Sequence, residues 1–174
     1  MRKLSLLLLT LAFFMPHMAQ AADVKIGVLD TAIIMSKSKA AQSLQSQLKT
    51  TRDAFDKEVA DFDKKMQDKE KALKDQQGKA DAAEFDKQRK QAESDFIKGR
   101  AALQQKKLNI EKSITAATSQ IQEKLVSIVG DIAKKEKLNI VLTRQQVVTM
   151  DESMNITDKV LGQLDSSLPT VSLK

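Results

Sequence analysis

The residues of this chain that most resemble a catalytic arrangement are acidic. Asp53, Asp56, Glu58, Asp61 and Asp63 lie close together in the sequence, and two carboxylates at a fixed separation can act as general acid and general base. The same stretch alternates acidic residues with Lys and Arg, however, which is typical of a solvated helix surface with ion pairs between residues four apart. We therefore expect a charged helix surface here and no catalytic pair.

The residue types that other active sites need are missing. The 174-residue sequence has no Cys, Trp or Tyr, and its single His, His17, lies in the apolar N-terminal segment. Thiol nucleophiles, disulfides, imidazole bases and Cys or His metal sites are therefore excluded for the rest of the chain. The glycines are scattered, so the sequence contains no phosphate-binding glycine loop. We expect a protein without enzymatic activity, cofactor or metal.

The first 21 residues have the pattern of a secretory signal. Arg2 and Lys3 precede an apolar run, and Ala19-Gln20-Ala21 matches a cleavage site. The run is short for a membrane span, so we expect cleavage after Ala21 and export, with an uncleaved anchor as the alternative. Removing Arg2 and Lys3 lowers the net charge from +6 to +4. This excess favours anionic partners, whereas export argues against nucleic acid.

Two apolar stripes mirror each other about Lys79. The descending stripe consists of Leu73, Met66, Phe62, Val59, Phe55, Leu48 and Leu44, and the ascending stripe of Phe85, Ala92, Phe96, Gly99, Leu103, Ile110 and Ile114. In both stripes an extra four-residue step replaces one heptad step. This symmetry predicts two amphipathic helices, about 39–77 and 80–136, folded back on each other at a turn near Gly78. Gly99 is either a flexible point or a site of close packing opposite Val59.

Outside this hairpin the apolar pattern becomes shorter and alternating. It predicts a strand at 24–29, a helical turn at 32–35, strands at 138–143 and 147–150 joined by a tight turn, and a short helix ending at Leu164. Asn155 or Thr157 can cap that helix, although Asn155-Ile156-Thr157 also matches a glycosylation sequon. Pro169 is expected in a tail.

The ascending helix is predicted to be longer than the descending helix. Beyond Thr118 its apolar face broadens, because Val126, Val129 and Ala133 join the stripe, and three short strands cannot supply a core of their own. This predicts an oligomer whose core includes Val24, Ile26, Val28, Ile121, Leu125, Ile128, Ile132, Ile140, Leu142 and Val147. The predicted division is a signal at 1–21, a hairpin arm at 39–118, and a body and oligomerisation region at 22–38 and 119–174.

Several segments together resemble the Skp/OmpH family of periplasmic chaperones over essentially the whole mature chain. These are the signal, the strand before Asp30, the charged hairpin, and the endings Leu138–Leu142 and Asn155–Leu161. The resemblance implies an α+β, mostly α fold: a long antiparallel helical hairpin, or coiled-coil tentacle, on a small β-sheet body that trimerises. It also implies a homotrimer that holds unfolded outer-membrane proteins without ATP and delivers them for assembly.

The candidate client-binding residues follow from the same hairpin. Ile97 and Leu108 lie off the seam near one side of the ascending helix, where they could touch a client, flank the stripe or meet another subunit. Basic candidates on this helix are Lys87, Arg89, Lys90, Lys98, Arg100, Lys106 and Lys107, which could attract acidic clients.

The basic residues leave other functions open. Anionic lipid or lipopolysaccharide is a further partner that the family resemblance suggests, although no basic cluster can be assigned to it. Rival functions are a structural or adaptor coiled coil of the cell envelope and an anionic-polymer binder.

Overall fold

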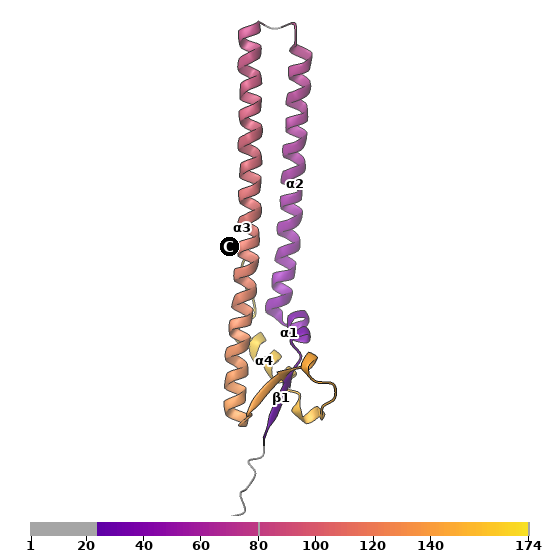
Figure 1. Ribbon diagram of the computed structural model, residues 1–174, viewed down its shortest axis with the longest axis vertical. Coiled ribbons are helices and arrows are strands. Elements are labelled where there is room, and N and C mark those ends of the chain that lie inside the picture. The colour runs from indigo at the N-terminus through magenta and orange to yellow at the C-terminus, as the bar shows by residue number, and fades with distance from the viewer. Residues whose placement is uncertain (1–23, 80, 174) are drawn as a thin grey trace, which may run out of the picture.

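The computed structural model describes residues 24–79 and 81–173, so the predicted signal lies outside the described residues. In chain order the elements are β1 (Ile26–Leu29), α1 (Thr31–Lys37), α2 (Lys39–Gln76), α3 (Ala82–Glu136), β2 (Ile140–Thr143), 3-10 helices at Arg144–Gln146 and Glu152–Met154, and α4 (Thr157–Ser167). The chain is mostly helical, as predicted (Figure 1). Within the described residues, no helix is both long and apolar enough to cross a membrane.

The two long helices dominate the molecule and lie side by side, joined by a turn at their far end (Figure 1). At 1.5 Å per residue, α2 is about 57 Å long and α3 about 83 Å. The turn contains Gly78 with a φ of 78°, a left-handed conformation that glycine adopts without steric cost. Asp81 is the N-cap of α3, and its carboxylate accepts hydrogen bonds from the N–H groups of Ala83 and Glu84.

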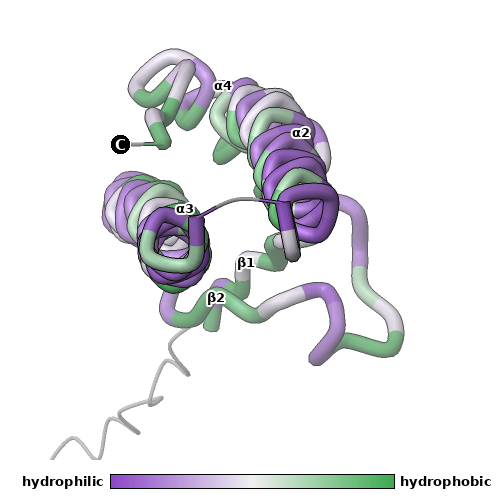
Figure 2. The backbone as a smooth tube through the Cα atoms, turned by 90° about the horizontal axis from the view of Figure 1, so that it is seen from above, coloured by the Kyte–Doolittle hydropathy of each residue, from purple (hydrophilic) through white to green (hydrophobic). Residues whose placement is uncertain are grey.

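The apolar stripes form the seam between α2 and α3. Every residue of both stripes is at least partly buried except Phe96, and hydrophilic residues are interleaved with hydrophobic ones along both helices (Figure 2). The rings of Phe62 and Phe96, predicted as a mirror pair, have centroids 6.2 Å apart. A Cβ atom on Gly99 would lie 2.0 Å from Cε2 of Phe62, so Gly99 is a site of close packing. Its neighbour is Phe62, where the mirror predicted Val59.

The sheet differs from the prediction. Strands β1 and β2 pair in parallel, from Ile26 opposite Ile140 to Leu29 opposite Thr143, and α1, α2 and α3 form the connection between them. The predicted third strand at 147–150 is wrong: a 3-10 turn follows β2, and Val148 is 99% exposed. The reason is local, because the side-chain oxygen of Gln146 accepts hydrogen bonds from the N–H and the hydroxyl of Thr143 and closes that turn.

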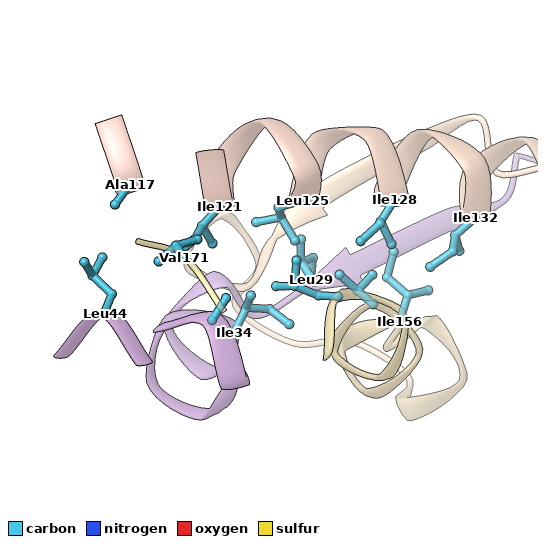
Figure 3. Close-up of a cluster of buried hydrophobic side chains, with 13 residues drawn as sticks. Leu29, Ile34, Leu44, Ala117, Ile121, Leu125, Ile128, Ile132, Ile156 and Val171 are labelled. Atoms are coloured by element: carbon cyan, nitrogen blue, oxygen red, sulfur yellow. The ribbon is translucent and has the colours of Figure 1, made fainter. Parts of the chain in front are cut away.

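Among the described residues, buried apolar side chains form a core around the first turns of α2 and the second half of α3. It joins Leu29, Ile34, Leu44, Ala117, Ile121, Leu125, Ile128, Ile132, Ile156, Val160, Leu164 and Val171 from β1, from α1 to α4 and from the C-terminal segment (Figure 3). The widened apolar face of residues 119–133 predicted a partner from another chain. This prediction is wrong for the buried side chains of this segment, because α4 and the C-terminal segment of the same chain cover them.

Helix α4 begins next to the end of β1. The side-chain oxygen of Asn155 accepts a hydrogen bond from the N–H of Thr157 at 3.0 Å, and its amide nitrogen donates to Glu152 at 2.7 Å. The hydroxyl of Thr157 accepts from the N–H of Asp30 at 2.9 Å. The N-cap of α4 is Ile156, which makes no side-chain capping hydrogen bond, so the predicted capping by Asn155 or Thr157 is wrong. Asn155 instead accepts from the first N–H of the helix, and Thr157 connects α4 to β1.

Candidate functional site

Exposed apolar side chains on α3 form the first part of the candidate site. Ile97 is 60% exposed and Leu108 is 40% exposed, and neither belongs to the seam. They are eleven residues apart, which is close to three helical turns, so both lie near one side of α3. Val126, 71% exposed, follows Leu108 by five more turns on the same side. The widened stripe predicted from the sequence included Val126, although its spacing from Leu108 places it in line with Ile97 and Leu108.

Four of the basic candidates are held in ion pairs of the arm itself. Lys106 pairs with Glu58 and Arg100 with Asp63, both across the seam to α2. Arg89 and Lys90 both pair with Asp86 on their own helix, at 3.0 and 2.7 Å. These side chains are about half exposed or more, so each pair contributes little stability.

The remaining basic candidates are free to meet a ligand. Lys87, Lys98 and Lys107 are exposed on α3, and within the described part of the chain none of them forms an ion pair with a carboxylate. Lys98 is adjacent to Ile97, and Lys107 is adjacent to Leu108. Each exposed apolar candidate therefore has an unpaired positive charge beside it in the sequence.

Arg100 has a structural role in the arm. Its guanidinium lies 5.7 Å from the ring centroid of Phe62 and 5.4 Å from that of Phe96, distances at which a cation is attracted to an aromatic face. It also pairs with Asp63 at 3.1 Å. The contacts of Arg100 cover the partly exposed ring of Phe96, so this residue stabilises the pairing of α2 and α3.

The carboxylates near this surface are stabilised in their charged form. A hydrogen bond from Lys69, assisted by one from Gln91, lowers the pKa of Asp95. Hydrogen bonds from Lys90 and then Arg89 lower the pKa of Asp86. Ordinary ion pairs account for both shifts. In the described residues, no group of His, Cys, Asp or Glu side chains is arranged to hold a metal ion.

The candidate oligomer-core residues fall into three groups. Val28, Ile121, Leu125, Ile128 and Ile132 are buried within one chain. Partial burial is found for Ile26, Leu142 and Val147. Val24 and Ile140 are exposed. In the described part of the body, large apolar side chains are also exposed at Val126, Val148 and Met154.

Comparison with known proteins identifies the family. The model of the OmpH family, described as outer membrane protein (OmpH-like), matches residues 25–164. The fold is similar to the crystal structure of a protein from Caulobacter crescentus CB15 proposed to be an outer membrane chaperone (OmpH-like), with a TM-score of 0.69 and 18% sequence identity. That similarity covers 92% of this chain and 95% of the other. No curated protein sequence matches this chain significantly. From the match over residues 25–164, this chain belongs to the OmpH-like family.

Proposed function

We propose that this protein is an ATP-independent holdase chaperone of the periplasm. It encloses unfolded outer-membrane β-barrel proteins, prevents their aggregation and delivers them for membrane assembly. Membership of the OmpH-like family supports this function, as does the shared fold with a protein whose name includes outer membrane chaperone. The observation that carries the proposal is the exposure of Ile97 and Leu108 on a long arm whose seam uses other residues.

Weak contacts suit such a function. An unfolded β-barrel precursor exposes apolar strands that aggregate edge to edge, so a host must shield these strands and still release them. Ile97 and Leu108 offer small apolar contacts about 16 Å apart along α3, each next to an unpaired lysine. These lysines attract acidic segments over a Debye length of about 8 to 10 Å. Neither kind of contact alone holds a client tightly.

The assembly is part of the proposal. We propose a homotrimer with arms at 39–118 and a shared body at 22–38 and 119–174, exported by the cleaved signal at 1–21. The exposed apolar side chains of Val24, Val126, Ile140 and Val148 support contacts between bodies. Buried Ala40, Ala41, Leu44 and Ala117 extend the core of the body slightly into the predicted arm. Anionic lipid or lipopolysaccharide is a further proposed partner of the basic arm, whereas no role in nucleic-acid binding, enzymatic catalysis or cofactor binding is proposed.

Replacement of the exposed apolar residues tests the function. The variant Ile97→Ser with Leu108→Ser removes apolar contacts without opening the seam, so we expect weaker suppression of outer-membrane protein aggregation, measured by light scattering during refolding. Helicity by circular dichroism and native mass should be unchanged. The matched control, Ala102→Ser with Gln104→Ser, changes two exposed residues of the same helix and should behave as the unmodified protein.

The same assay separates the chaperone from an adaptor coiled coil. An adaptor binds one folded partner through a specific patch and would leave the aggregation of an unfolded outer-membrane protein unchanged. If the unmodified protein gives no suppression, the proposed function is wrong. Full suppression by the double serine variant would show instead that these two residues are not the client-binding contacts.

A further inference from the structure

The C-terminal segment after α4 is a structural feature that the proposed function does not explain. Helix α4 ends at Ser167, and Pro169 follows, which cannot continue a helix. Residues 168–173 then run without regular secondary structure alongside the first turns of α2 and the middle of α3. This segment, here called the tail, lies beyond the family match at residues 25–164.

Val171 holds the tail in the core. Its side chain is only 4% exposed and belongs to the cluster that contains Leu44, Ala117 and Ile121. Figure 3 shows Val171 between Leu44 of α2 and Ile121 of α3. Because Ala117 is small, the two helices leave space between them at this level, and a β-branched side chain from the tail fills it. The tail is thus seated between α2 and α3.

Gln47 binds the tail backbone on both sides of Ser172. Its side-chain amide nitrogen donates to the carbonyl oxygen of Val171 at 2.6 Å, and its side-chain oxygen accepts from the N–H of Leu173 at 3.1 Å. A neighbouring β-strand would make the same pair of hydrogen bonds with residues two apart. The amide also donates to the hydroxyl of Ser43 at 3.0 Å, which orients it. Gln47 therefore recognises extended backbone and places no demand on side-chain identity.

The tail does not fill the groove in which it lies. Beside Thr170 to Ser172 there is an open space of about 580 Å³ along α3, lined by Lys112, Ala116 and Gln120 among others. A smaller space of about 210 Å³ lies next to Leu173, between Thr51 of α2 and Ile110 of α3. A segment with larger side chains than Val171 and Ser172 has room in the same place.

We propose that residues 168–173 are a displaceable strap in a groove for extended polypeptide, and that an apolar extended segment of an unfolded client takes the place of the strap. The groove fits a partner with alternating apolar residues, because Gln47 recognises backbone, Val171 occupies an apolar site and unfilled volume lies on both sides. Unfolded β-strand segments have this chemistry. The identity of the displacing chain rests on the proposed function.

Distance measurement between spin labels tests displacement directly. The chain contains no cysteine, so Lys49→Cys on α2 and Ser172→Cys on the tail give two unique sites at exposed residues, with labelled chain diluted into excess unlabelled chain. We expect one narrow short distance in the free protein and a long, broad distribution after an unfolded outer-membrane protein is added. A narrow short distance that persists when co-elution demonstrates bound client would overturn the proposal.

A peptide with the tail sequence Leu-Pro-Thr-Val-Ser-Leu tests the groove itself. In the full-length variant Val171→Asp a carboxylate replaces the buried side chain, so the tail should leave and the labelled peptide should bind at least about tenfold more tightly than to the unmodified protein, where the tethered tail competes. Ser172→Asp adds the same charge at an exposed position and should bind as weakly as the unmodified protein. Equal binding to all three proteins would contradict the groove.

Two further measurements make the outcome specific. Adding Gln47→Ala to Val171→Asp should abolish peptide binding, and retained binding would locate the peptide elsewhere and overturn the proposal. If Val171→Asp loses helicity, Val171→Ser replaces it. Aggregation assays run in parallel separate the two proposals. If neither the unmodified protein nor any variant suppresses aggregation, the chaperone function is contradicted. If aggregation is suppressed while the tail stays in its groove, only the strap is contradicted.

Discussion

At the scale of single residues, the contact between Gly99 and Phe62 shows how closely the arm is packed. Glycine inside a helix costs about 1 kcal/mol relative to alanine, so its presence in α3 needs a reason. The reason is steric, since a Cβ atom there would lie 2.0 Å from the Phe62 ring. That ring is held in turn by Phe96 and by the guanidinium of Arg100. Removing the glycine must therefore disturb several side chains.

Gly99→Ala should destabilise the arm, although alanine is the better helix former. Overpacking typically costs about 1 to 3 kcal/mol, which exceeds the gain of about 1 kcal/mol in helix propensity, so the thermal midpoint of helix loss should fall. Gly130→Ala is the matched control in the same helix, where an added Cβ meets no atom within 4 Å. That control should raise the midpoint. If both variants raise it, the close packing at Phe62 does not constrain the arm.

At the scale of elements, ion pairs across the seam help to fix the register of α2 and α3. Asp95 pairs with Lys69 and Asp63 with Arg100, and Glu58 pairs with Lys106. The pairs of Arg100 and Lys106 are about half exposed and that of Lys69 about one third exposed, so each one adds little to stability. Each helix carries both acidic and basic members of these pairs, so a shifted pairing of the helices would separate the charges from their partners.

The pH dependence of the arm should reflect Asp95. Hydrogen bonds from Lys69 and then Gln91 lower the pKa of Asp95 below its ordinary 3.8 in the folded protein. The charged form is thus favoured by folding, and the contribution of Asp95 to stability is present above pH 3.8 and lost as the pH falls through the lowered value. Thermal melts between pH 2 and 7 should show a smaller acid loss for Asp95→Asn, whereas Asp131→Asn serves as control. Identical acid profiles for Asp95→Asn and the unmodified protein would contradict this role.

At the scale of the whole molecule, the body of one chain leaves several large apolar side chains exposed. One chain buries its own core, yet Val126, Ile140 and Val148 remain exposed around it. Isolated exposed apolar residues are common on protein surfaces, whereas several on one small body favour contacts with other chains. The proposed homotrimer would cover them.

Native mass spectrometry tests this assembly. We expect a mass of three chains for the unmodified protein and one chain for Val126→Asp with Ile140→Asp, because charged side chains in an apolar interface are costly. Circular dichroism should show unchanged helicity, since neither side chain belongs to the core. Gln122→Asp, an exposed change on the same helix, should remain trimeric. A single-chain mass for the unmodified protein at micromolar concentration would contradict the trimer.

The seam and the turn of the long helices could be predicted from the sequence, because helical periodicity is a local signal repeated over many residues. The sequence predicted the partly buried stripes, the turn at Gly78 and the pairing of Phe62 with Phe96. It also showed that Ile97 and Leu108 lie off the seam, where they are exposed.

The way in which the body closes could not be predicted from the sequence. The parallel pairing of β1 with β2, the loss of the strand at 147–150, and the seat of the tail on Gln47 all join residues far apart or depend on one short turn. Such contacts leave no periodic pattern in the sequence. For the same reason, the apolar face from Ile121 to Ile132 predicted a second chain, whereas α4 and Val171 of the same chain cover it.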